Sequence, residues 1–189
     1  RDRTGIPEIV HAGHKPPDVV ADALVRLAER DGRAMASRCE PDLAERVERL
    51  LAGRWEVTRH DAAHALVIAE PGRAVQHSGG RVGILTAGTS DVPVAAEAGL
   101  VAREMGAEVD EAFDVGVAGL HRLVEPLERM MATGCDVLVV AAGMDGALPS
   151  VVAGLVDVPV IGLPTSVGYG FGGGGVGALT TMLQSCAPG

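Results

Sequence analysis

Residues 81–93 read RVGILTAGTSDVP and hold, in one run, a short apolar segment, a glycine turn and the start of a helix. The apolar segment is continuous rather than alternating, which is typical of a strand buried on both faces. Thr89, Ser90 and Asp91 carry the side chains that most often cap a helix, and Pro93 suits the first helical turn. This stretch therefore predicts a strand, a tight turn and a helix in direct succession.

The same succession recurs three times towards the end of the chain. The expected strands are 81–87, 109–113, 136–142 and 159–164, and the expected helices are 92–105, one that ends near 133, 150–156 and 178–185. Strands that alternate with helices pair in parallel through right-handed crossovers. We therefore expect an α/β fold with a three-layer, doubly wound parallel sheet whose strands are covered on both faces. In such folds ligands bind where strand carboxyl ends meet helix amino ends.

The first third of the chain differs from the rest. Helical spacing of apolar residues predicts helices over 16–30 and 41–53, and ALVIA at 65–69 is a short buried strand. PGRAVQHSGG at 71–80 lacks apolar periodicity and is rich in turn-forming residues, which indicates a linker. We therefore predict a small α+β module over 1–75 and the α/β domain over 76–189.

The composition indicates a globular chain in the cytoplasm. The 189 residues carry a net charge of −9 and are 47% hydrophobic. No apolar run approaches the roughly 20 residues of a bilayer span, and no basic-then-apolar leader opens the chain. The 16 basic residues are dispersed among 25 acidic ones, so we expect neither a membrane nor a nucleic-acid partner. The three cysteines lack metal-type spacing, which predicts reduced thiols.

Polar residues at the predicted corners are candidates for chemistry, although each also has a structural explanation. His121 and Arg122 begin a helix, where an imidazole can transfer a proton and a guanidinium can bind an anion. Asp145 stands between two glycines after the most apolar strand, so its carboxylate must face a pocket or solvent. The capping residues after the first strand could cap the helix, bind an anion, or do both.

These corners resemble those of the aminoimidazole ribonucleotide carboxylase superfamily, known as PurE. Ser90-Asp91-Val92-Pro93 is similar to its nucleotide corner, GLHRL at 119–123 to its Ala-His-Arg, and residues 139–166 to its Ala-Ala-Gly loop and following strand. One departure is that Ala147 replaces the histidine of the loop that handles carbon dioxide.

Nearly the whole chain resembles the LarB family, which makes the nickel-pincer nucleotide cofactor. The resemblance rests on RTGIPEIVHAGHKPPDVV at 3–20, AGTSDVPVAAEA at 87–98, DVGVAGLHRL at 114–123, GALPSVVAGLV at 146–156, PTSVGYG at 164–170 and LQSCAPG at 183–189. It implies a PurE-like enzyme that carboxylates the pyridinium ring of nicotinic acid adenine dinucleotide. The enzyme also hydrolyses the phosphoanhydride, releasing AMP and pyridinium-3,5-biscarboxylic acid mononucleotide.

The resemblance also implies a site. Cys186 would be the nucleophile that adds to ring carbon 4, because the resulting enamine can attack carbon dioxide whereas a pyridinium cannot. The implied catalytic residues are Cys186, Asp145 and His121, and the implied substrate-binding residues are Thr89, Ser90, Asp91, Arg122, Gly143, Met144 and Ser166. A divalent cation, Mg²⁺, is the implied cofactor, with unassigned ligands, and carbon dioxide or bicarbonate is the co-substrate. A homo-octamer with sites at subunit contacts is the implied assembly.

Two departures from the LarB pattern accompany the match. Asp145 stands where the family has glutamate, one methylene longer. The family also continues past the cysteine with a further strand and helix, so we expect this chain to be a fragment. Two other functions stay open, namely an aminoimidazole ribonucleotide carboxylase or mutase of purine biosynthesis, and a nucleotide-binding subunit without catalysis.

Overall fold

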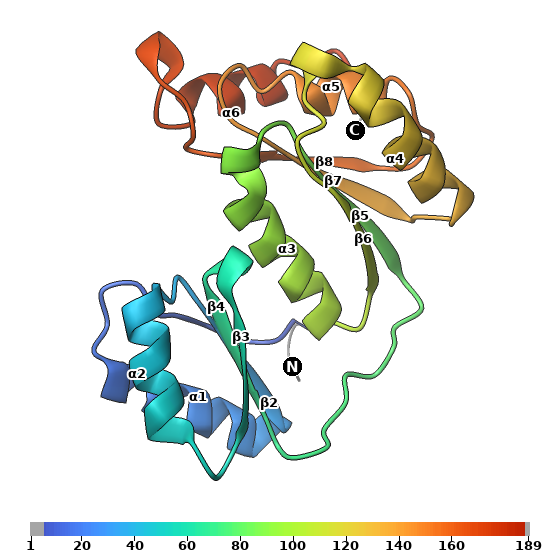
Figure 1. The fold of residues 1–189 in the computed structure, drawn as a ribbon. Coiled ribbons are helices and arrows are strands. Elements are labelled where there is room, and N and C mark those ends of the chain that lie inside the picture. Colours follow the sequence, from blue (N-terminus) through green and yellow to red (C-terminus); the bar gives the residue numbers. More distant parts are fainter. Residues whose placement is uncertain (1–5, 188–189) are drawn as a thin grey trace. The chain divides into compact units, whose positions relative to one another are not determined.

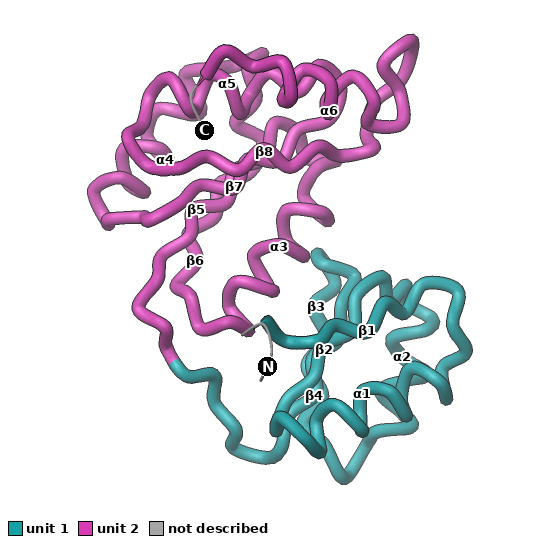
Figure 2. The backbone as a smooth tube through the Cα atoms, turned by 180° about the vertical axis from the view of Figure 1, so that it is seen from behind, with its two compact units in different colours: residues 1–76 teal, residues 77–189 magenta. Residues whose placement is uncertain are grey.

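The computed structural model describes residues 6–187, which form two compact units with a boundary between Gln76 and His77. Figure 2 shows the two units in different colours. The boundary falls inside the stretch 71–80, in which no helix or strand forms. The first residues of the motif at 3–20 and the last two of the motif at 183–189 lie outside the described residues.

The first unit is a four-stranded mixed sheet with two helices (Figure 1). Its elements are β1 (Ile9–His11), α1 (Pro17–Asp31), β2 (Arg33–Ser37), α2 (Pro41–Leu51), β3 (Glu56–His60), a 3-10 turn (Asp61–Ala63) and β4 (Ala65–Ala69). The strand order is β1-β2-β4-β3, with β1 parallel to β2 and β4 antiparallel to both of its neighbours. The two helices and β4 match the sequence-based prediction, whereas β1, β2 and β3 were not predicted.

The core of the first unit lies between the sheet and the two helices. Leu24 of α1 and Val47 of α2 are fully buried with Leu66 and Ile68 of β4. Burial of each large apolar side chain stabilises the folded state by roughly 1.5–3 kcal/mol. Helix α1 ends at Gly32, whose left-handed backbone (φ 78°) lets its N–H donate to Ala28 O.

The second unit contains a four-stranded sheet in which every pair is parallel. Its elements are β5 (Arg81–Thr86), a 3-10 turn (Thr89–Asp91), α3 (Val92–Glu104), β6 (Glu108–Ala112), a 3-10 turn (Val117–Gly119), α4 (His121–Ala132), β7 (Val137–Ala142), α5 (Leu148–Ala153), β8 (Val160–Pro164), a 3-10 turn (Gly170–Gly172) and α6 (Val176–Leu183). The strand order is β6-β5-β7-β8, so the chain adds β6 on one side of β5 and then adds β7 and β8 on the other side. This is the doubly wound pattern of flavodoxin-like folds. The predicted fold class is therefore confirmed.

Helices cover the two faces of this sheet unequally. Side chains of α4 and α5, including Leu123, Met130 and Val152, pack with Leu138 and Val140 of β7 in the larger core. On the opposite face, α3 packs its buried residue Ala95 against Ile84 and Ala141. The expectation that all strands are covered on both faces is wrong for β8, where Ile161 is 53% exposed. The neighbouring Gly162 faces Met182 of α6 and Pro149 of α5, so Ile161 lies on the opposite face of β8 (Figure 1).

The helix ends differ from prediction by about two residues. Helix α5 begins at Leu148 rather than near residue 150, because Pro149 fits the first helical turn. Helix α6 begins at Val176 after Gly175, whose backbone is left-handed (φ 84°). None of the helices within residues 6–187 is long and apolar enough to cross a membrane.

Candidate functional site

The loops that follow β5 and β6 are held together at the carboxyl edge of the parallel sheet. Thr86, fully buried at the end of β5, accepts a hydrogen bond at Oγ1 from the backbone N–H of Asp114 (3.0 Å). A Cβ on Gly116 would lie only 2.4 Å from Ala87 O, so this position accepts glycine alone. The first two corners predicted from the sequence therefore meet in the structure.

Asp91 joins the β5 corner to the β8 corner. Its carboxylate accepts a hydrogen bond at Oδ2 from the backbone N–H of Gly88 (2.9 Å) and one at Oδ1 from Thr165 Oγ1 (2.6 Å). Asp91 is 4% exposed and Thr165 is 1% exposed. A buried carboxylate needs such donors, because burial without hydrogen bonds is costly. Within one chain, both carboxylate oxygens thus hold the turn together, and the neighbouring Thr89 and Ser90 side chains are exposed.

The corner after β7 is a tight turn that rests on the loop after β8. A Cβ on Gly143 would lie 2.2 Å from Val167 O and 2.8 Å from Thr165 Oγ1, so only glycine permits this approach. The N–H of Met144 donates to Val167 O (2.9 Å). Asp145 is exposed, and its Oδ1 accepts a hydrogen bond from the N–H of Ala147 (3.2 Å). Met144, Asp145 and the nearby Ser166 are thus presented to solvent at this edge.

His121 and Arg122 are the first two residues of α4 and are both exposed. The Arg122 guanidinium donates to Asp114 Oδ2, within the loop that contacts Thr86. This ion pair fixes the arginine beside the carboxyl edge of the sheet. The four predicted corners therefore lie along one edge. Of the residues predicted to bind substrate, Asp91 and Gly143 are buried there, and the exposed ones are Thr89, Ser90, Arg122, Met144 and Ser166.

The three thiols have different environments. Cys39 and Cys135 are buried, and Cys186 is exposed. Burial raises the pKa of Cys39 to about 11 and also raises the pKa of Cys135. Since the thiolate is the nucleophilic form, both buried thiols are poor nucleophiles near neutral pH. Cys186 is the accessible thiol of the described chain.

Cys186 follows α6 and lies outside the turns after β5, β6 and β7. Helix α6 starts beside Thr165, where a Cβ on Gly175 would lie 3.0 Å from the Thr165 carbonyl oxygen. It then runs back along β8, and its eight residues span about 12 Å. Ser185 and Ala187, which flank Cys186, line a small hollow with Val160 at the amino end of β8.

The segment that carries Cys186 is anchored to α5. The hydroxyls of Ser150 and Ser185 are 2.7 Å apart and share a hydrogen bond. Ser185 Oγ also accepts a hydrogen bond from the N–H of Ala187 (3.1 Å). The residues on both sides of the cysteine are therefore held, while the cysteine itself faces solvent.

Three residues at the carboxyl edge were not singled out from the sequence. Thr165 carries no recognisable motif of its own, and its role depends on contact with Asp91. Tyr169 and Phe171 are 81% and 109% exposed and lie in the loop 165–175 between β8 and α6, which we call the glycine loop. The chain contains one Trp, one Tyr and two Phe, so two of its four aromatic side chains stand exposed in this one loop. This concentration of aromatic residues in one loop is the sequence signal that could have identified Tyr169 and Phe171.

No group of three or more His, Cys, Asp or Glu side chains within residues 6–187 is arranged to hold a metal ion. A cation bound by protein side chains alone is therefore not supported in this part of the chain. Mg²⁺ commonly binds through one or two carboxylates together with water and substrate phosphates.

Known proteins similar to this chain fall into two groups. A protein of Methanocaldococcus jannaschii described as uncharacterized is 43% identical over 189 residues, which cover 99% of this chain and 72% of that protein. The N5-carboxyaminoimidazole ribonucleotide mutase of Pyrococcus abyssi is 38% identical over 88 residues, or 44% of this chain and 48% of the mutase. The mutase of Thermotoga maritima is 31% identical over 88 residues, or 44% of this chain and 49% of the mutase.

Family-level sequence models divide the chain in the same place as the structure. The model of the AIR carboxylase family matches residues 81–188, and the model of the LarB/PurE-like N-terminal domain matches residues 1–70. The first match covers the parallel sheet and all the predicted site residues. The chain therefore belongs to the AIR carboxylase family, and its N-terminal domain places it among the LarB proteins.

Proposed function

We propose that this protein is a pyridinium-3,5-biscarboxylic acid mononucleotide synthase of nickel-pincer cofactor biosynthesis. It would carboxylate the pyridinium ring of nicotinic acid adenine dinucleotide and hydrolyse the phosphoanhydride with release of AMP. The observation that carries the proposal is the exposed thiol of Cys186 on an AIR carboxylase-type domain that follows a LarB-type domain. The three free cysteines suit the cytoplasmic location that we propose.

A pyridinium ring cannot attack carbon dioxide, and addition of the Cys186 thiolate converts it into an enamine that can. The Cys186 thiolate adds to ring carbon 4, and the electron pair of the adjacent double bond neutralises the ring nitrogen to give an enamine. Carbon 5 of the enamine attacks carbon dioxide and becomes a carboxylate. A base then removes the proton from carbon 5, the thiolate leaves carbon 4, and the ring is aromatic again. The net change replaces one hydrogen with a carboxylate and releases one proton.

The position of Cys186 favours a site shared between two copies. The residues that flank the thiol line a hollow beside β8 and α5, whereas the turns built around Asp91 and Gly143 belong to the loops after β5 and β7. A thiol on one copy would therefore act on a dinucleotide held at the carboxyl edge of another. Such sharing requires a homo-oligomer, for which we propose the octamer of PurE-like proteins.

The remaining residues suit binding and proton transfer. The exposed backbone turn at Thr89 and Ser90 and the guanidinium of Arg122 can hold phosphate oxygens. Asp145 and His121 are exposed at the same edge, and either can accept the proton from carbon 5. Mg²⁺ would be held by the pyrophosphate of the substrate with Asp145 as a single carboxylate ligand, and it would offset phosphate charge.

A second candidate is an aminoimidazole ribonucleotide carboxylase or mutase. It is favoured by the similarity to two N5-carboxyaminoimidazole ribonucleotide mutases over 88 residues. Ala147 counts against it, because a methyl group cannot transfer the proton that the histidine of that superfamily transfers. The thiol mechanism does not need a proton-transferring side chain at position 147, so Ala147 is compatible with it.

One incubation separates these functions. The protein is mixed with nicotinic acid adenine dinucleotide, bicarbonate and Mg²⁺, and the products are identified by mass spectrometry. The proposed function requires a biscarboxylated mononucleotide and AMP in equal amounts. A parallel incubation with aminoimidazole ribonucleotide and bicarbonate tests the second candidate. Turnover only in that second incubation would reject the proposed function.

A further inference from the structure

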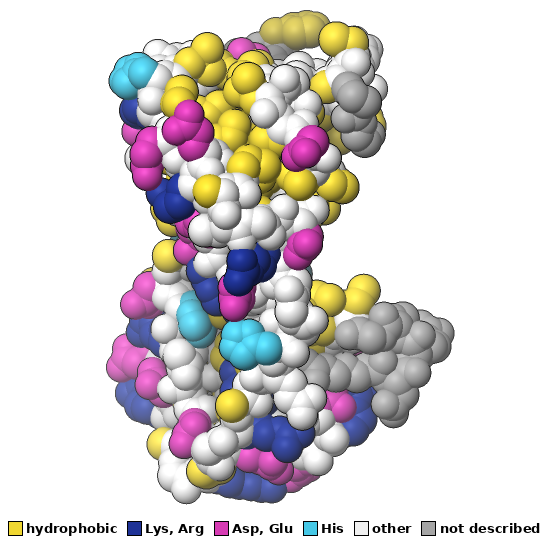
Figure 3. Space-filling model, turned by 90° about the vertical axis from the view of Figure 1, so that its right-hand side faces the viewer, with side chains coloured by type: hydrophobic (Ala, Val, Ile, Leu, Met, Phe, Trp, Pro, Cys, Tyr) yellow, Lys and Arg dark blue, Asp and Glu magenta, His cyan; other side chains and the backbone are white. Residues whose placement is uncertain are grey.

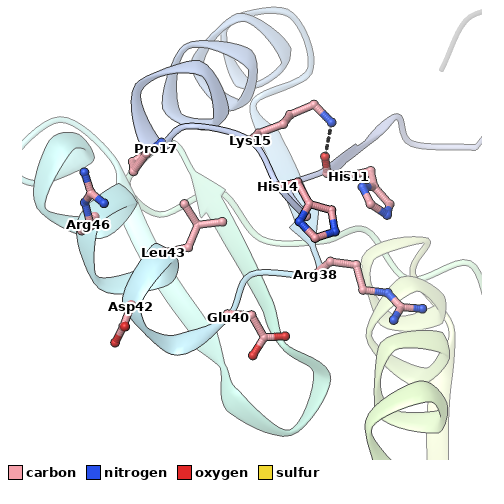
Figure 4. Close-up of a pocket in the computed structure, with 10 residues that line it drawn as sticks. His11, His14, Lys15, Pro17, Arg38, Glu40, Asp42, Leu43 and Arg46 are labelled. Atoms are coloured by element: carbon pink, nitrogen blue, oxygen red, sulfur yellow. Dashed lines mark hydrogen bonds between the residues drawn. The ribbon is translucent and has the colours of Figure 1, made fainter.

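The first unit contains a pocket that the proposed chemistry does not use. The pocket has a volume of about 570 Å³ and lies at one end of the mixed sheet (Figure 4). Its lining is mostly basic or polar, formed by His11, Gly13, His14, Lys15, Pro17, Arg38, Glu40, Asp42, Leu43 and Arg46. Small-molecule sites commonly have volumes of about 300–1,000 Å³.

The fold of this unit creates the pocket. β1 and β2 are parallel neighbours, so their carboxyl ends, at His11 and Ser37, lie at the same edge. Each strand is followed by a short loop and a helix, and α1 and α2 both begin there. Neither helix has a side-chain hydrogen bond at its N-cap, and each begins with a proline, Pro17 or Pro41, that has no N–H to donate. In parallel α/β folds, ligands commonly bind at such an edge of the sheet.

Basic side chains from two separate loops converge on this edge. Figure 4 shows His11, His14 and Arg38 together at one end of the pocket, with Lys15 above them. Lys15 Nζ donates to His11 O, which holds the ammonium group at the end of β1. Arg46 lies on the other side of the pocket, with Leu43 between the two basic ends (Figure 4).

The pocket also contains two acidic residues. Glu40 Oε2 lies 3.4 Å from Nδ1 of His64, which is not among the lining residues. Asp42 lies beside the amino end of α2, and Figure 4 shows its carboxylate pointing away from His14 and Lys15. A carboxylate there can accept hydrogen bonds from hydroxyl or amino groups. The pocket thus has a basic end, an apolar floor and hydrogen-bond acceptors.

We infer that the pocket of the first unit binds an organic phosphate of mononucleotide size, with its phosphate at His14 and Lys15. A charged ammonium forms strong hydrogen bonds with phosphate oxygens. Inorganic phosphate would occupy a small part of 570 Å³ and leave Leu43 and Arg46 without contact. The inference goes beyond the proposed carboxylation and does not depend on it.

The test uses AMP, inorganic phosphate and adenosine as probes on the full chain. Hydrogen exchange is followed by mass spectrometry with and without each probe. AMP should slow exchange in the peptides that cover 11–18 and 38–46, and adenosine and phosphate at the same concentration should do so far less. Protection confined to peptides of the second unit, or no protection, would overturn the inference.

Calorimetry with charge-reversal variants checks the same site. Lys15→Glu, and separately Arg46→Glu, should weaken AMP binding by about tenfold or more, because each places a negative charge in the pocket. Both side chains are exposed, so neither change removes core packing. Arg26→Glu is the matched control, since it makes the same charge change on α1 outside the pocket, where Arg26 pairs with Asp22. Equal losses in Lys15→Glu and Arg26→Glu would mean that net charge, not this pocket, governs binding.

Discussion

Thr165 Oγ1 donates a 2.6 Å hydrogen bond to Asp91 Oδ1, and both residues are almost completely buried. The two residues are 74 positions apart in the chain and follow β5 and β8, which are separated in the sheet by β7. The other carboxylate oxygen accepts the N–H of Gly88. The turn that presents Thr89 and Ser90 therefore depends on a contact made across the carboxyl edge.

We expect Thr165→Val to destabilise the second unit and weaken dinucleotide binding together. The change keeps the shape but leaves a buried carboxylate oxygen without its donor, which costs about 1–3 kcal/mol or more. Urea unfolding measures the first effect, and calorimetry with nicotinic acid adenine dinucleotide measures the second. Thr180→Val is the control, because Thr180 is exposed and its hydroxyl bonds only to Val176 O in its own helix. Equal stability of the two variants would contradict this role for Thr165.

The accessible thiol should form a visible adduct. NAD has the same electrophilic pyridinium with an amide in place of the acid, so mixing it with the protein should produce an enamine band in the near ultraviolet. Cys186→Ser should abolish the band, since an alkoxide is not accessible near neutral pH. Cys39→Ser and Cys135→Ser should retain it, because both thiols are buried and their pKa values are raised. A band that survives in Cys186→Ser would reject covalent catalysis by this residue.

If the thiol acts on a neighbouring copy, two inactive variants should rescue one another. Cys186→Ser and Asp91→Ala are unfolded together, mixed in equal amounts and reassembled. About a quarter of the shared sites then combine an intact thiol with an intact Asp91 turn. Carboxylation should rise from near zero to about a quarter of the wild-type rate. Each variant reassembled alone is the control, and no recovery in the mixture would place the thiol and its substrate in one copy.

The exposed aromatics of the glycine loop should contribute to substrate binding. A base or pyridinium ring that stacks on an aromatic side chain gains about 1–3 kcal/mol. Phe171→Ala and Tyr169→Ala should therefore each raise the Kd for the dinucleotide by about fivefold or more. Neither change should alter stability, because both side chains are almost fully exposed. Leu50→Ala, an exposed apolar residue of the first unit, is the control. Unchanged affinity would leave the loop without a role in recognition.

Assembly should depend on an apolar groove between α4 and α5. The groove has a volume of about 630 Å³, and its lining includes Leu120, Val124 and Leu155, which are about half exposed or more. Figure 3 shows hydrophobic side chains gathered on this side of the second unit. Val124→Glu should dissociate the oligomer, because a charge cannot be buried there unpaired.

Analytical ultracentrifugation measures this effect on assembly. Leu50→Glu, which puts a charge on an exposed leucine of the first unit, is the matched control and should keep the wild-type sedimentation. An oligomer that persists in Val124→Glu would place the subunit contact on another surface.

Local sequence patterns determined the framework of the second unit. Continuous apolar runs such as VLVVAA at 137–142 predicted its strands, and the glycine corners predicted where its loops turn. These signals are local, because backbone conformation and the burial of a strand depend on neighbouring residues. The strands β2 and β3 escaped prediction because RAMAS and EVTRH carry little apolar pattern, and pairing with β4 holds them in place.

The sequence by itself determined which residues could act, and the tertiary structure decided where each one stands. The motifs placed Asp91 and Cys186 in one family site, and the cysteine spacing indicated only that the three thiols are reduced. Folding buried Asp91 against Thr165, buried two thiols and left Cys186 exposed at the far end of α6. Burial and long-range contacts come from the packing of segments distant in sequence, so no local pattern of residues could specify them.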